Sequence, residues 1–134
     1  TAGGHTTVRF DKRAQLLAGM LAGHFRDDPW FSVTDPLSFT VFVDYNLPNV
    51  LRSLKVLQYD SELARRVDRG QPLEPWSRAE IAVRAATLLA TDELAVKLSR
   101  TRDQPVTGPR LDYALFGARD GVDTKPHRCA TTAY

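Results

Sequence analysis

The chain has 134 residues, the usual size of one folded domain, and 43% of them are hydrophobic, which is enough to form a buried core. Its net charge of +2 is too small to indicate nucleic-acid binding, and no apolar run approaches the ~20 residues that a membrane-spanning helix needs. A single cysteine, Cys129, excludes a disulfide within the chain and fits the reducing cytoplasm, and the three scattered histidines indicate no metal site.

The first predicted element is an amphipathic helix over residues 11–25, with Asp11 as its N-cap. Its apolar face is expected to carry Leu16, Leu17, Met20, Leu21 and His24. A loop broken by Pro36 follows, and it leads into a short apolar run at residues 39–43. Side chains of this run belong in the interior of the protein, so we expect the run to be buried.

Two shorter helices are predicted after this run. The first spans residues 48–57 and begins at Pro48, because proline suits the first turn of a helix. Its apolar face is expected to carry Val50, Leu51, Leu54 and Leu57. The second spans residues 61–67, and Gly70 shortly after it is expected to stop the helix.

The longest helix is predicted over residues 77–98. Ser77-x-x-Glu80 has the form of a capping box, in which each side chain bonds the free backbone NH of the other residue. The apolar positions that follow are Ile81, Ala85, Leu88, Leu89 and Val96. A last short helix is predicted over residues 109–116, followed by a polar, irregular tail. No segment alternates apolar and polar residues as a sheet requires, so we predict a single all-α domain.

Asp44 is the most informative candidate for chemistry, because it directly follows the apolar run at Phe42 and Val43. A carboxylate in such a place is costly unless it is paired, hydrogen-bonded or used, and burial raises its pKa toward that of a general acid or base. The alternative is that Asp44 caps the helix that follows it. Asp112, next to Tyr113, is a second carboxylate in aromatic surroundings.

Four other charged residues also have a structural interpretation. Lys12 and Arg13, at the start of the first predicted helix, either bind an anion there or form a solvated basic pair. Glu80 is explained by the capping box, and Arg84 by an i,i+4 ion pair with Glu80. The sequence contains no glycine-rich phosphate loop, nucleophile elbow or HExxH motif.

Five short motifs then occur in one order along the chain. They are Lys12-Arg13-Ala14-Gln15-Leu16-Leu17, Phe42-Val43-Asp44-Tyr45, Glu80-Ile81-Ala82-Val83-Arg84, Leu111-Asp112-Tyr113, and the tail with Pro126-His127-Arg128 before Tyr134. In this order they resemble the C-terminal part of the queuosine salvage family, the queuosine 5′-phosphate N-glycosylases. The resemblance covers nearly all of the chain. The residues that depart from the family pattern are Asn46, Ala82, Phe116 and, in the tail, Cys129-Ala130-Thr131.

The resemblance implies a hydrolase that cleaves the N-glycosidic bond of queuosine 5′-monophosphate and releases queuine for tRNA modification, with no cofactor. Asp44 matches the aspartate of the family motif and is expected to be catalytic, because a carboxylate near the anomeric carbon stabilises an oxocarbenium-like state or activates water. Tyr45, beside it, is expected to bind the substrate.

The resemblance also suggests which residues hold the rest of the nucleotide. Lys12 is expected to contact the 5′-phosphate, and Arg84 and His127 are the next candidates for binding this part of the substrate. Asp112 is expected either to read the donor groups of the deazaguanine base or to cap the last helix.

The resemblance further implies a fold like that of the helix-hairpin-helix DNA glycosylases. The paired glycines of their hairpin are not visible here, so we expect no direct binding to nucleic acid. Family members are longer than this chain, so we expect residues 1–134 to be the C-terminal part of a longer enzyme, whose N-terminal half or another chain is the partner. Two alternatives stay open: a glycosylase for another base, and a non-catalytic helical remnant that acts by association.

Overall fold

The computed structural model describes residues 10–134, and helices form nearly all of the regular structure in that range. The helices are α1 (Lys12–His24), α2 (Asn46–Ser53), α3 (Ser61–Asp68), α4 (Arg78–Arg102) and α5 (Gly108–Gly117), with 3-10 turns at Pro29–Phe31, Pro36–Ser38 and Arg119–Gly121. The described part contains no strand, and its one β-bridge is an isolated parallel contact between Leu73 and Cys129. The prediction of an all-α chain is therefore confirmed for these residues.

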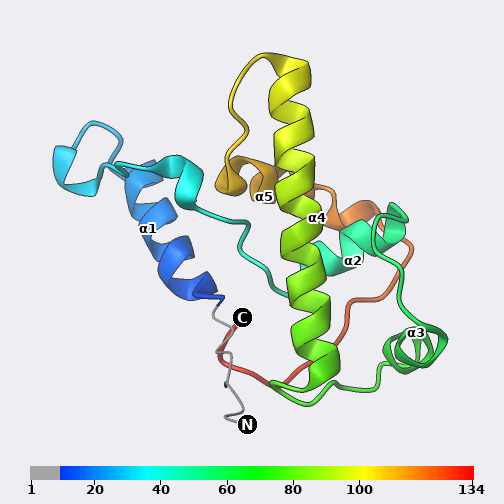
Figure 1. Cartoon of the computed structure of the whole chain (residues 1–134). Helices are drawn as coiled ribbons and strands as arrows, with labels where there is room; N and C mark the ends of the chain where they lie inside the picture. The colour runs from blue at the N-terminus through cyan, green and yellow to red at the C-terminus, as the bar shows by residue number, and fades with distance from the viewer. Residues whose placement is uncertain (1–9) are drawn as a thin grey trace, which may run out of the picture.

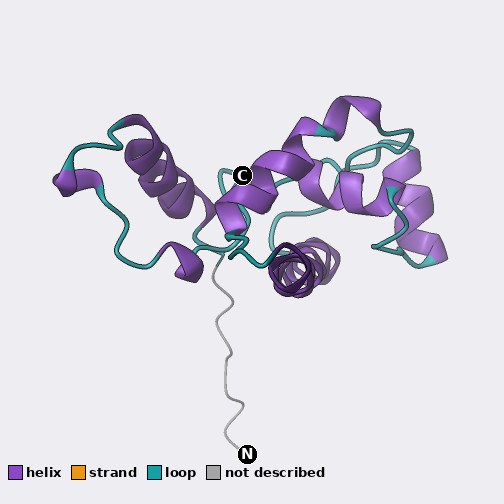
Figure 2. Cartoon of the chain, turned by 90° about the horizontal axis from the view of Figure 1, so that it is seen from above, coloured by secondary structure: helices purple, strands orange, loops and turns teal. Residues whose placement is uncertain are grey.

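The helices are arranged around α4, which is the longest of them (Figure 1). The helices α2 and α5 pack against α4 and against each other. In both views α1 stands to one side of this group, and the C-terminus lies close to the start of α1 (Figures 1 and 2). None of the helices within residues 10–134 is long and apolar enough to cross a membrane.

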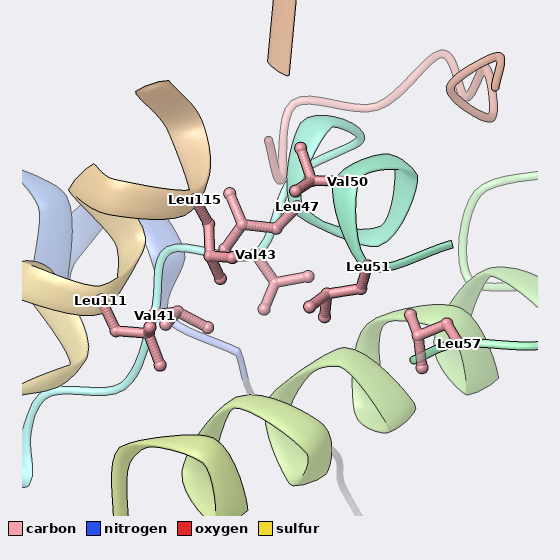
Figure 3. Packing of buried hydrophobic residues seen from close by; sticks show 8 residues of the cluster. All are labelled: Val41, Val43, Leu47, Val50, Leu51, Leu57, Leu111 and Leu115. Atoms are coloured by element: carbon pink, nitrogen blue, oxygen red, sulfur yellow. The ribbon is translucent and has the colours of Figure 1, made fainter. Parts of the chain in front are cut away.

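The hydrophobic core lies where three parts of the chain meet α4 (Figure 3). The apolar run before α2 contributes Val41 and Val43, and α5 contributes Leu111 and Leu115. The remaining buried members are Leu47, Val50, Leu51 and Leu57. Fully burying one such side chain contributes roughly 1.5–3 kcal/mol, so this core fixes the 41–43 segment firmly between α2 and α5.

Side-chain caps set the starts of three helices. Asp60 accepts hydrogen bonds from the backbone NH groups at the start of α3, Thr107 caps α5, and Ser77 Oγ accepts from the backbone NH of Glu80 at 3.3 Å. Gly70, after α3, has a φ of 69°, a left-handed conformation that glycine adopts without strain. The serine half of the predicted capping box is confirmed, whereas the Glu80 side chain bonds inward to Arg84 and Tyr134 instead.

Two predicted apolar faces are largely uncovered, although Leu88 of α4 is partly buried against the core as predicted. In α1 no residue is buried, and Leu17 and Met20 are 60% and 64% exposed. In α4 the buried residues are mostly polar, namely Glu80, Val83, Arg84, Thr87 and Thr91, whereas Leu89 and Val96 face solvent. Helical spacing identifies a stripe of apolar residues, but the neighbouring elements decide whether that stripe is covered.

The second predicted helix is shifted along the chain. It begins at Asn46 and ends at Ser53, so Leu54 lies outside it and is exposed, whereas Leu57 reaches the core from the loop that follows. The early start brings Asp44 next to the first turn of the helix. The chain therefore passes directly from the buried run into α2. The two residues at this junction are Asp44, which is half-buried, and Tyr45, which is exposed.

A close backbone approach joins α5 to the 39–43 segment. A Cβ atom on Gly108 would lie 2.2 Å from the carbonyl oxygen of Phe39 and 2.4 Å from the carbonyl carbon of Thr40. No side chain fits at that distance, so glycine is required where α5 begins. This contact sets the distance between the N-terminal end of α5 and the segment that carries Asp44.

Candidate active site

Four of the residues singled out in the sequence meet in one cleft. Its volume is about 700 Å³, and its walls come from the 12–20 part of α1, the 42–46 segment and the 109–116 part of α5. Lys12, Asp44, Tyr45 and Asp112 all line it. These residues are separated by up to a hundred positions in the chain, and the packing of α5 on the core brings them together.

Asp44 is held by the start of α2. One carboxylate oxygen, Oδ1, accepts a hydrogen bond from the backbone NH of Asn46 at 2.7 Å, and Oδ2 lies 3.3 Å from the Asn46 side-chain amide. Asp44 is not the N-cap of α2, because that position is Tyr45, which makes no side-chain cap bond; Asp44 instead accepts from the NH of the first helical residue, Asn46. The carboxylate is only half-buried and also lines the cleft, so this bond fixes its position without removing it from the site.

Asp112 faces Asp44 from α5 and is in a different electrostatic state. Burial raises the pKa of its carboxyl group to about 6, and the negative charge of Asp44 adds to that rise. The backbone NH of Phe42, which donates to Oδ2 at 2.7 Å, and the charge of Lys12 act in the opposite direction. Asp112 lies inside α5, whose N-cap is Thr107, so the prediction that it caps the last helix is wrong.

Lys12 stands at the first position of α1, on the opposite wall of the cleft. Gln15 attaches this end of the helix: its Oε1 accepts a hydrogen bond from the backbone NH of Thr40 at 2.9 Å, and its Nε2 donates to the Phe10 carbonyl at 3.3 Å. Gly19, one turn further along, lies against the ring of Phe42. The sequence motif contained Gln15, but its helical position gave no sign that it would bridge two segments.

Arg84 lies outside the cleft, although it was expected near the phosphate. It is 1% exposed, its Nη1 donates to Glu80 Oε1 at 3.3 Å, and its guanidinium group lies 3.8 Å from the centre of the Phe10 ring. It does line a smaller cavity of about 320 Å³ between the start of α1 and Trp76, and Lys12 borders that cavity as well. The predicted i,i+4 ion pair of Glu80 with Arg84 is confirmed.

His127 is also buried, with 2% of its surface exposed, and lines none of the cavities described above. Its Nε2 lies 2.7 Å from the Tyr134 hydroxyl oxygen, and that hydroxyl donates to Glu80 Oε1 at 3.0 Å. Burial lowers the pKa of His127 below its ordinary value, so the ring is neutral near pH 7. Glu80 and Tyr134 were assigned no site role from the sequence, because a capping box already explained one and an irregular tail contained the other.

The cleft thus combines two carboxylates, one cation and aromatic side chains. Asp44 supplies fixed negative charge, Asp112 exchanges a proton near neutral pH, and Lys12 supplies positive charge on the facing wall. Tyr45 and Tyr113 add exposed aromatic rings that suit a planar base. Within residues 10–134 no three His, Cys, Asp or Glu side chains are placed to hold a metal ion. Such a set suits acid–base or electrostatic catalysis on a polar, planar ligand.

Comparisons with known proteins show which family the chain resembles. Residues 3–134 match the family model described as queuosine salvage protein. The chain is 35% identical over 130 residues to the queuosine 5′-phosphate N-glycosylase/hydrolase of Sphaerobacter thermophilus. The aligned region covers 95% of this chain and 40% of that protein. The protein of the same name from Dictyostelium discoideum is 26% identical over 129 residues, with the same shares covered, and that from Mus musculus is 32% identical over 119 residues, covering 81% of this chain and 34% of the relative. The chain therefore spans no more than about 40% of the length of these relatives.

Proposed function

The chain belongs to the queuosine salvage protein family, and we propose that it forms part of an enzyme that hydrolyses the N-glycosidic bond of queuosine 5′-monophosphate. The products are queuine, which is then available for tRNA modification, and ribose 5-phosphate. The proposal rests above all on the convergence of Lys12, Asp44, Tyr45 and Asp112 on one cleft. The relatives named above carry this activity in their names.

The reaction breaks the bond between the anomeric carbon and the base nitrogen. The electron pair of that bond leaves with the base, positive charge develops on the sugar, and the oxygen of a water molecule bonds to the anomeric carbon. One proton of the water ends on the base and the other stays on the new hydroxyl group. Asp44 stabilises the positive charge or accepts the proton from the attacking water, because its carboxylate is held in place by the NH of Asn46.

The remaining groups of the cleft bind and orient the nucleotide. Asp112, with its raised pKa, exchanges hydrogen bonds with the polar edge of the base, and Tyr45 packs against the planar ring. Lys12 contacts the 5′-phosphate, which is remote from the reacting bond, so that binding energy supports the chemical step. Arg84 and His127 act from behind the wall rather than by contact, since neither lines the cleft.

We also propose that residues 1–134 form the C-terminal part of a longer cytoplasmic enzyme with a fold like that of the helix-hairpin-helix DNA glycosylases, without direct binding to nucleic acid. The all-helical architecture supports the fold assignment. The unburied face of α1 and the greater length of the relatives support a further N-terminal part that covers this face. A crystal structure of the full-length protein tests both assignments.

A chimeric enzyme gives a direct test of the activity. In it, this chain replaces the matching segment of the Sphaerobacter thermophilus relative, and queuine and ribose 5-phosphate are measured by mass spectrometry after incubation with queuosine 5′-monophosphate. We expect both products in equal amounts. A chimera whose circular dichroism and melting temperature match those of the parent enzyme, yet which releases no queuine, would instead identify the chain as a non-catalytic remnant. When other nucleoside 5′-monophosphates are offered in separate incubations, faster release of their base than of queuine would identify a glycosylase of different specificity.

A further inference from the structure

A continuous row of hydrogen bonds connects the C-terminal tail to the start of α4. Its members, which we call the tail network, are Arg84, Glu80, Tyr134 and His127. Glu80 Oε1 accepts from both Arg84 Nη1 and the Tyr134 hydroxyl group. That hydroxyl has one proton, which goes to the carboxylate, so its oxygen must accept from His127 Nε2. The geometry thus assigns to His127 the tautomer with the proton on Nε2.

The tail network lies outside the cleft but contacts residues that belong to or directly adjoin two of its walls. The Tyr134 ring lies 6.3 Å from the ring of Tyr45, which lines the cleft next to Asp44. At the other end, Arg84 stacks on Phe10, the buried residue that directly precedes the helix carrying Lys12. The Tyr134 ring also lies 5.1 Å from the Arg84 guanidinium group. The Tyr134 side chain therefore lies between Tyr45, on one wall, and Arg84, which stacks on Phe10 at the base of the other wall.

These contacts matter because α1 has few others. No residue of α1 is buried, so this wall is held at its first turns by Phe10, by the Gln15 bridge to Thr40 and by the contact of Gly19 with Phe42. A catalytic group acts well only when bound substrate lies within a fraction of an ångström of the productive position. The distance between Lys12 and Asp44 therefore depends on the few contacts that hold the start of α1.

We propose that Tyr134 is a positioning residue of this site. Its hydroxyl holds the tail between Glu80 and His127, and its ring supports Tyr45 and Arg84, so that it sets the placement of Asp44 relative to Lys12. It touches no substrate, and its effect passes through Tyr45 on one side and through Arg84 and Phe10 on the other.

The first test uses the 134-residue chain alone and does not depend on activity. In nitrogen-15 NMR spectra, His127 should show a protonated Nε2, with a bare Nδ1, and a downfield, slowly exchanging Nε2 proton. Tyr134→Phe should remove that proton signal and shift the backbone resonances of Phe10, Lys12, Asp44 and Tyr45 together. The control Thr124→Val also removes a hydroxyl from the tail, where Thr124 Oγ1 bonds Asn49 Oδ1 at 2.9 Å, and it should leave these resonances in place.

Either of two NMR results would overturn the proposal. One is a His127 ring protonated on Nδ1 alone, which contradicts the assigned row of hydrogen bonds. The other is a Tyr134→Phe spectrum whose changes stay within the tail and do not reach Lys12 and Asp44.

The second test uses the full-length enzyme and rests on the proposed function. At a temperature well below the melting point of every variant, Tyr134→Phe should lower kcat about 10- to 100-fold, with KM changed by less than about threefold, because the phosphate contact survives while Asp44 is misplaced. His127→Gln keeps an NH donor toward the hydroxyl and should retain most of kcat, whereas His127→Leu should not. Thr124→Val should behave like the unsubstituted enzyme.

A purely structural role gives a different pattern. In that case Tyr134→Phe lowers the melting temperature but leaves kcat equal to that of Thr124→Val, and the proposal fails. If the unsubstituted enzyme itself releases no queuine, the proposed function fails, and the NMR results still decide whether Tyr134 positions the two walls.

Discussion

At the scale of single residues, Asp44 combines two roles that first looked like alternatives. Its Oδ1 accepts the backbone NH of Asn46, and the same carboxylate lines the cleft. A residue held by the chain's own backbone needs no reorganisation when charge develops beside it, which is what electrostatic catalysis requires. The bond to the start of α2 therefore supports a catalytic role rather than competing with it.

Replacing Asp44 with asparagine separates these roles. The amide oxygen keeps the bond to the Asn46 NH, so the fold should survive, but the negative charge is lost. We expect kcat for queuine release to fall by a factor on the order of 10²–10⁴, with a melting temperature close to that of the unsubstituted enzyme. Near-normal release by Asp44→Asn in the full-length enzyme would show that Asp44 only holds the start of α2.

Lys12 should affect binding more than chemistry. Lys12→Ala removes the cation that faces the phosphate, so KM for queuosine 5′-monophosphate should rise while kcat changes little. The ratio of kcat/KM for queuosine 5′-monophosphate to kcat/KM for queuosine should fall by about the same factor as that rise in KM. Arg13→Ala is a matched control, because Arg13 is exposed and borders only the smaller cavity. An equal effect of both substitutions would indicate a general loss of positive charge instead.

Asp112 should make stability depend on pH. The pKa of Asp112 is about 6 in the folded protein, whereas an ordinary aspartate, as in the unfolded chain, has a pKa of 3.8. Between these two pH values the folded protein therefore binds more protons than the unfolded chain. The free energy of unfolding therefore falls as pH rises through this range, by ~1–2 kcal/mol once the partial exposure of the group is considered. Asp112→Asn keeps an acceptor for the Phe42 NH and should remove this dependence. Urea unfolding at pH 4 and pH 7 measures this change in the free energy of unfolding. The same change in Asp112→Asn as in the unsubstituted protein would contradict the raised pKa of Asp112.

At the scale of elements, the start of α5 depends on a missing side chain. Gly108→Ala would place a Cβ 2.2 Å from the Phe39 carbonyl oxygen, so the helix must move away from the 39–43 segment. We expect a loss of about 1–3 kcal/mol in the free energy of unfolding, measured with urea. Gly117→Ala, at the other end of α5, meets no atom within 4 Å and should be neutral or slightly stabilising. Equal effects of the two substitutions would show that the close approach is not rigid.

Local signals predicted the elements better than their surroundings. Ser77 and Gly70 marked helix ends correctly because caps act on the nearest backbone groups. The buried stripe of α4 was missed because its polar members are satisfied by each other or by the backbone; for example, Thr87 Oγ1 donates to the Val83 carbonyl. No periodicity rule detects such pairing.

The site shows the same division. Motif order identified Lys12, Asp44, Tyr45 and Asp112, which the structure brings together in the cleft, but also Arg84 and His127, which lie outside it. Gln15, Glu80 and Tyr134 were not recognised as supports of the site, because each acts through a partner far away in sequence. Contacts of that kind are decided by tertiary packing, which a single sequence does not display.

At the scale of the whole molecule, the exposed face of α1 is the feature that the isolated chain leaves unexplained. Leu17 and Met20 project from a helix with no buried residue, and the relatives carry more than half of their length outside the matched region. Leu17→Glu should change the unfolding free energy of the 134-residue chain by less than about 0.5 kcal/mol. In the full-length protein the same change should lower the melting temperature by several degrees, because a buried charge lacks a partner. Equal, small effects in both proteins would show that α1 stays uncovered.

The cleft walls come from residues 12–20, 42–46 and 109–116, so the site depends on contacts between the two ends of the chain. Loops of this length close late in folding, after the local helices have formed. A nascent chain that still lacks α5 therefore has α1 but only part of the cleft. Because the α5 wall is synthesised after the other two, the cleft is complete only when residues up to 116 have been made and have folded.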